Sequence, residues 1–106
     1  MLKKPGLTHD EHVQLGQVLA GIRNQLGHER TALLNAYPQT GTKSAPAHQL
    51  RVAIDALDKA RYALENAAFA EHPEEASKAD YFPPTECRAV VVLPEQSAGA
   101  QPVLPT

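Results

Sequence analysis

Three histidines and a glutamate are the residues of this chain best suited to holding a metal ion. His9 and His12 lie about one helical turn apart, and Glu71 and His72 follow much later in the sequence. Imidazole nitrogens and carboxylate oxygens are ligands that zinc takes in proteins. The four residues make a zinc site only if the fold brings them together. The alternative, which we favour, is that they are exposed polar residues at helix ends, and we therefore expect no metal and no other cofactor.

A second pattern lies in the hexapeptide RNQLGH, residues 23–28. It resembles the R-N-x-x-x-H signature of the HEPN-domain ribonucleases, carried here by Arg23, Asn24 and His28. The resemblance implies that Arg23 and His28 would meet across a dimer interface, where the arginine would stabilise charge on a scissile phosphate and the histidine would move a proton. The alternative is that Arg23 pairs with Asp58 across the fold and that His28 is a solvated surface residue.

Cys87 is the only cysteine of the chain, so no internal disulfide can form. This is typical of a protein from a reducing cytoplasm, and we expect that location. A nucleophilic thiol needs a nearby base or a helix N-terminus, and the neighbours of Cys87 are Glu86 and Arg88. We therefore expect that Cys87 is not catalytic. Because the sequence also has no glycine-rich phosphate loop, nucleophile elbow or paired carboxylates, a non-enzymatic protein is favoured over an enzyme.

The first helix that could position these residues is predicted over residues 8–36. Thr8 and Glu11 fit a capping box, in which each side chain accepts a hydrogen bond from the other residue's backbone N–H. Pro38 disfavours a helical conformation at the residue before it, so the helix should end near Ala36. Its apolar seam recurs at helical spacing and consists of Leu15, Leu19, Ile22, Leu26 and Leu33.

The second helix is predicted over residues 45–72. Ser44 can cap its start, and Pro46 suits its first turn, where a missing N–H costs nothing. The pair His72-Pro73 ends it. Its seam consists of Leu50, Ile54, Leu57, Leu64 and Ala68.

The turn-forming residues 38–46 join two helices of nearly equal length, which predicts an antiparallel hairpin. Folding about this connection places leucines of the two seams at matching heights: Leu19 with Leu64, Leu26 with Leu57, and Leu33 with Leu50. The predicted fold class is therefore all-α, a long two-helix hairpin preceded by an N-terminal arm, residues 1–7.

Residues 73–106 differ in character from the hairpin. They hold six of the nine prolines and a group of acidic residues, so we expect an acidic, Pro-rich and mostly disordered tail. The aromatic pair Tyr81-Phe82 is a candidate for folding back on the hairpin. The run from Arg88 to Leu93 is strand-like without a second strand to pair with. Residues 81–93 are therefore a candidate contact for a protein partner.

Glycines within a helix cost about 1 kcal/mol each relative to alanine, so Gly16, Gly21 and Gly27 require a compensating contact. Small residues let helices approach closely, and we interpret two flanks beside the leucine seams as a dimer interface. The interface predicted on this basis consists of Gly16, Ala20, Gly27, Leu34, Ala53, Ala56, Ala60, Ala63 and Ala67. Glu29 and Arg61 interrupt the seams and could pair between the two copies.

The chain has 106 residues and a net charge of −2, which gives no general attraction to nucleic acid or to an anionic membrane. The Ala-rich composition is typical of a bacterial protein. We predict a small non-enzymatic helical interaction module that forms a homodimeric four-helix bundle and contacts a partner through its tail. The alternative function is that of a HEPN-like ribonuclease.

Overall fold

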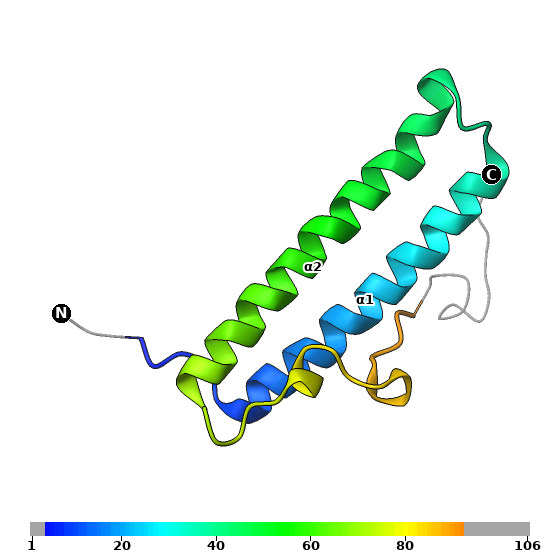
Figure 1. The fold of residues 1–106 in the computed structure, drawn as a ribbon. Coiled ribbons are helices and arrows are strands. Elements are labelled where there is room, and N and C mark those ends of the chain that lie inside the picture. The colour runs from blue at the N-terminus through cyan, green and yellow to red at the C-terminus, as the bar shows by residue number, and fades with distance from the viewer. Residues whose placement is uncertain (1–3, 93–106) are drawn as a thin grey trace.

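The computed structural model describes residues 4–92, and these residues form helices without any strand. Two long helices, α1 (His9–Ala36) and α2 (Ala45–Glu71), lie side by side and run in opposite directions (Figure 1). Three short 3-10 helices complete the described part: η1 (Gly41–Ser44), η2 (Lys78–Asp80) and η3 (Thr85–Cys87). The predicted all-α fold with two long helices is confirmed.

The helix ends follow from local chemistry. The Thr8 hydroxyl accepts from the Glu11 amide at 3.1 Å, and Glu11 Oε1 accepts from the Thr8 amide at 2.9 Å, so the predicted capping box is present. The predicted Ser44 cap is wrong. Ser44 belongs to η1, which leads directly into α2, and its hydroxyl donates to the Gly41 carbonyl at 2.8 Å.

The seam between α1 and α2 is narrow. Ile54 and Ala68 are buried. Most of the seam is only half-buried, namely Leu15, Leu19, Leu26, Leu33, Leu50, Leu57 and Leu64. In the described residues the buried apolar core comprises Ala20, Ala47, Ile54, Ala68 and Tyr81. Two helices alone therefore give this protein a small core.

A third layer comes from the C-terminal segment, which we define as residues 73–92. It turns back at the end of α2 and runs along α1 (Figure 1). A Cβ atom on Gly16 would overlap the carbonyl oxygen of Asp80, and one on Gly21 would overlap that of Ala89. The Ala89 amide donates to the Gln17 carbonyl at 3.0 Å. These two glycines therefore let the segment's backbone lie directly against the helix.

This packing bears on two sequence-based expectations. Within the described residues, those from Arg88 to Val92 form no strand, and the Ala89 amide bonds to the backbone of α1. The expected fold-back of Tyr81 and Phe82 on the hairpin is present, since Tyr81 is buried and the Arg61 guanidinium lies over the Phe82 ring. The disorder predicted for residues 93–106 concerns residues outside the described part of the chain.

The two glycine environments predict opposite effects of the same substitution. Gly16→Ala should destabilise the protein by about 1–3 kcal/mol, because the overlap with Asp80 exceeds the gain in helix propensity. Gly27→Ala should stabilise it by up to about 1 kcal/mol, because the added methyl group meets nothing within 4 Å. Urea unfolding measures both. Equal effects at the two positions would contradict the docking of the C-terminal segment on Gly16.

Candidate functional site

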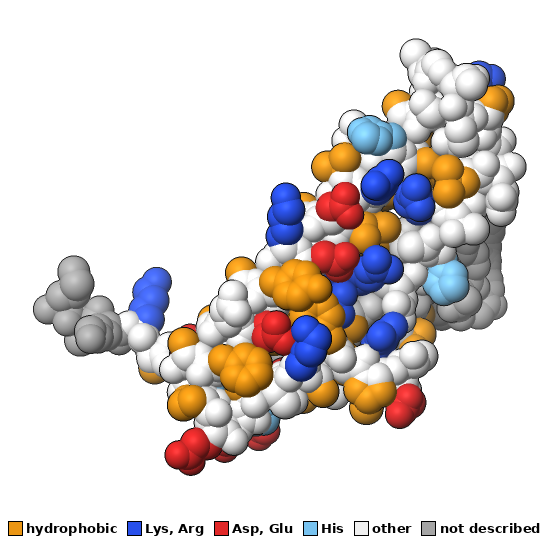
Figure 2. Space-filling model, in the orientation of Figure 1, with side chains coloured by type: hydrophobic (Ala, Val, Ile, Leu, Met, Phe, Trp, Pro, Cys, Tyr) orange, Lys and Arg blue, Asp and Glu red, His pale blue; other side chains and the backbone are white. Residues whose placement is uncertain are grey.

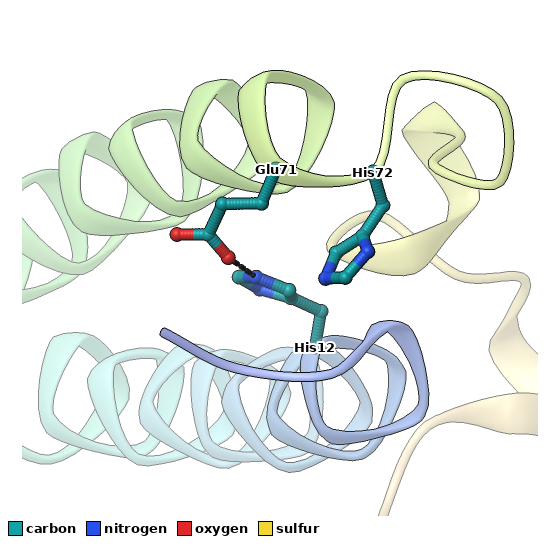
Figure 3. Close-up of side chains that lie close together, drawn as sticks. All are labelled: His12, Glu71 and His72. Atoms are coloured by element: carbon teal, nitrogen blue, oxygen red, sulfur yellow. Dashed lines mark hydrogen bonds and ion pairs between the residues drawn. The ribbon is translucent and has the colours of Figure 1, made fainter. Parts of the chain in front are cut away.

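A buried histidine lies at the end of the hairpin where α1 begins and α2 ends. His12 is 1% exposed. Its Nε2 lies 2.8 Å from Glu71 Oε1 (Figure 3). Its Nδ1 lies 2.6 Å from the Tyr81 hydroxyl. An ionised carboxylate only accepts, so Nε2 carries the proton and Nδ1 accepts from Tyr81. His12 thus joins α1, α2 and the C-terminal segment through two hydrogen bonds.

The protonation states of its neighbours agree with this assignment. The hydrogen bond from His12 lowers the pKa of Glu71, against a smaller opposing effect of desolvation, so the carboxylate is ionised at neutral pH. Burial, with the nearby charge of Asp80, raises the pKa of Tyr81 above its ordinary value of 10.0. The tyrosine hydroxyl therefore keeps its proton and donates it.

His72 completes a group of three metal-ligating side chains. One ligand atom from each of His12, Glu71 and His72 lies within 4.8 Å of the others. The His72 ring packs edge-on against His12, with ring centroids 5.9 Å apart. Its Nε2 donates to the Leu7 carbonyl at 2.7 Å, and its Nδ1 lies 3.7 Å from Glu75 Oε1. The antiparallel fold thus brings together three of the four residues that the sequence identified.

His9, the fourth residue, is held elsewhere. Its Nε2 lies 3.0 Å from Oδ2 of Asp80, a buried carboxylate that also accepts from the Ser77 amide. The interpretation of the cluster as exposed polar residues is wrong for His12. Neither His12 nor Asp80 could be recognised as buried from the sequence, because the covering segment has no periodicity.

Arg61 attaches the C-terminal segment to α2, a structural role that we did not expect. It is 5% exposed, and its Nε and Nη2 both donate to the Tyr81 carbonyl, at 3.1 and 2.8 Å. Its Nη1 lies 3.2 Å from Asp58, and its guanidinium stacks over Phe82. The predicted pairing with Glu29 of a second copy is therefore wrong, because Arg61 is bound within its own chain. Glu29 is exposed and accepts from Gln25 at 2.7 Å.

The three residues of the ribonuclease-like pattern do not lie together: Arg23 and Asn24 have partners within the chain, and His28 does not share them. Arg23 Nε lies 3.5 Å from Asp58 Oδ1, which confirms the alternative pairing, and the Asn24 side chain accepts from Arg88 at 3.2 Å. Both residues line a pocket of about 280 Å³ between the hairpin and the C-terminal segment. His28 is exposed and does not line this pocket. Cys87 is a free and exposed thiol.

The two flanks that we predicted as one interface have different surroundings. Gly16 and Ala20 are buried under the C-terminal segment, Gly27 meets open space, and Leu34 is half-buried. On α2 the small residues are exposed at Ala53, Ala56, Ala60 and Ala63 and half-buried at Ala67. The role of Gly16 and Ala20 in a dimer is therefore wrong, because their contacts are made within one chain.

Comparison with protein-family models, curated proteins and solved structures finds no match to this chain. Within residues 4–92, neither helix has an apolar stretch of the length needed to cross a bilayer. Function must therefore be argued from the geometry of the chain itself.

The His12–Glu71 hydrogen bond predicts a specific acid sensitivity. A lowered carboxyl pKa contributes stability above the ordinary value of 4.5, and this contribution is lost as the pH falls through the lowered value. The difference in unfolding free energy between the wild type and Glu71→Gln should therefore shrink below about pH 4.5. Thermal unfolding between pH 6 and 3 measures it. Glu74→Gln, at an exposed neighbour, is the control, and an identical pH dependence for both variants would contradict the assignment.

Proposed function

We propose that this protein is a non-enzymatic helical module that self-associates, two hairpins packing into a four-helix bundle. The observation that carries the proposal is an exposed apolar surface on the side of the hairpin away from the C-terminal segment. We call this surface the uncovered face. It consists of Val18 and Ile22 from α1 and Ala53, Ala56, Ala60 and Ala63 from α2.

Helix geometry places these residues on one side. On α1, Val18 and Ile22 lie about half a turn from Gly16 and Ala20, which the C-terminal segment covers. On α2, Tyr62 contacts Phe82 of that segment, with ring centroids 4.9 Å apart, and the alanines lie on the opposite side of the helix. The face drawn in Figure 2, over which the segment lies, shows charged residues of both signs among apolar side chains.

The exposure of this face is large for a hairpin with so small a core. Val18 is 46% exposed and Ile22 is 37% exposed. Leu57 and Leu64 are half-buried beside the alanines. Small domains with little buried apolar area commonly need a further source of stability, and oligomerisation is one. Covering the uncovered face would bury these residues.

A second copy of the chain is the occupant that fits this face best. Alanines three and four residues apart let two helices approach closely, as Ala53, Ala56, Ala60 and Ala63 are spaced. The other broad side of α1 is already occupied over Gly16 and Gly21. A face that packs against its own copy favours a closed dimer with two-fold symmetry over a longer assembly.

Of residues 81–93, those near the end of the described chain are the better candidates for contact with a protein partner. Tyr81 is buried and therefore cannot present its side chain to a partner, whereas Val90 and Val92 are 83% and 64% exposed. The ribonuclease function stays an alternative hypothesis, although Arg23 and Asn24 are engaged within the chain. RNA cleavage by the wild type that disappears in both Arg23→Ala and His28→Ala would favour it.

The dimer proposal predicts a position-specific effect of one added charge. The wild type should have twice the chain mass of 11.4 kDa in light scattering at micromolar concentration. Ala60→Glu should be monomeric, because it places a carboxylate in the apolar contact. Thr31→Glu adds the same charge at an exposed position of α1, about half a turn from Val18 and Ile22, and should stay dimeric.

A monomeric and fully helical wild type would refute the dimer. A dimer that persists in Ala60→Glu would show that the interface lies outside the uncovered face.

A further inference from the structure

The three side chains that meet at the end of the hairpin form a set with the chemistry of a zinc site. His12, Glu71 and His72 come from the start of α1 and the end of α2, and their side chains point toward one another (Figure 3). Two imidazoles and a carboxylate suit zinc better than magnesium or calcium, which prefer oxygen ligands. We infer that these three residues bind one zinc ion and that the ion joins the two ends of the hairpin.

The distances are close to those of a bound site. Ligands about 2.0–2.1 Å from a tetrahedral zinc ion are separated from one another by about 3.3 Å. The three candidate ligand atoms already lie within 4.8 Å of one another, and His12 Nε2 is 2.8 Å from Glu71 Oε1. Glu71 is exposed, so its flexible side chain can supply most of the adjustment. His12 is buried and provides the fixed position.

The ring nitrogens that face away from the ion also have partners. A histidine that binds a metal through one nitrogen usually donates its other N–H to an oxygen, which fixes the ring orientation. When zinc takes the place of the proton on His12 Nε2, the neutral ring carries its proton on Nδ1, which can donate a hydrogen bond to the Tyr81 hydroxyl oxygen 2.6 Å away. His72 faces the Leu7 carbonyl with one nitrogen and the Glu75 carboxylate with the other. Zinc binding at one of these nitrogens would replace its present contact, while the other nitrogen keeps its oxygen acceptor.

The consequence for the protein is a metal-dependent gain in stability. The ligands come together only in the folded chain, so zinc binds the native state in preference to the unfolded state. The site lies where the N-terminal arm, both helices and the C-terminal segment meet, because His72 contacts Leu7 and His12 contacts Tyr81. An ion there would hold the hairpin closed at the end without a covalent connection. This inference does not depend on self-association.

Zinc titration of the metal-free, full-length protein tests the site. Isothermal calorimetry should give one zinc per chain, and zinc should raise the melting temperature. Glu71→Gln is the most informative variant, because its amide oxygen can still accept from His12 while the anionic ligand is lost. This variant and His72→Ala should each weaken zinc binding at least tenfold and lose the thermal shift.

Three variants provide matched controls. His28→Ala and His48→Ala remove exposed histidines outside the cluster, and Cys87→Ser removes the exposed thiol. All three should bind zinc as the wild type does. The inference is overturned if the wild type shows no stoichiometric binding, if Glu71→Gln binds as tightly as the wild type, or if a control loses binding. Circular dichroism checks that His72→Ala is folded, and Glu71→Gln decides the matter if it is not.

Discussion

The hydrogen bond between the buried Tyr81 hydroxyl and His12 is the interaction on which the rest of this structure depends. Tyr81 is completely buried, and its carbonyl also accepts two hydrogen bonds from Arg61. One residue of the C-terminal segment is thereby attached to both helices. Its position requires Gly16, because any side chain there would overlap the neighbouring carbonyl of Asp80. The segment thus becomes a third layer of a fold that would otherwise be two helices.

This arrangement gives the hairpin two unlike sides. One side is closed by a polar and aromatic contact, in which Arg61 and Arg23 pair with Asp58 and His9 lies within hydrogen-bond distance of Asp80. The other side has no covering segment within the described residues and carries alanines and half-buried leucines. Because the segment supplies polar anchoring more than apolar area, the core stays small. A second copy on the uncovered face would add the apolar contact that one chain lacks.

The sequence predicted those features that depend on regular spacing. The capping box of Thr8 and Glu11, the lengths of the two helices and the Arg23–Asp58 pair follow from helical periodicity and antiparallel folding. The sequence showed that the glycines of α1 are costly, but it did not show that the C-terminal segment packs on Gly16 and Gly21. The segment makes this contact with its backbone, which leaves no pattern in its side chains. Tyr81 was named as a residue that folds back on the hairpin, but its hydrogen bonds with His12 and Arg61 were not predicted. Arg61 was assigned to a dimer because its partner, a carbonyl oxygen, has no side-chain signature.

The free energy of unfolding of Tyr81→Phe, compared with Tyr62→Phe, tests most directly whether this hydrogen bond holds the fold together. Tyr81→Phe removes one hydroxyl and leaves His12 Nδ1 buried without its donor, so it should cost about 1–3 kcal/mol. Tyr62 is 52% exposed, and the same change there should stay within about 0.5 kcal/mol. Equal unfolding free energies for the two variants would contradict the account.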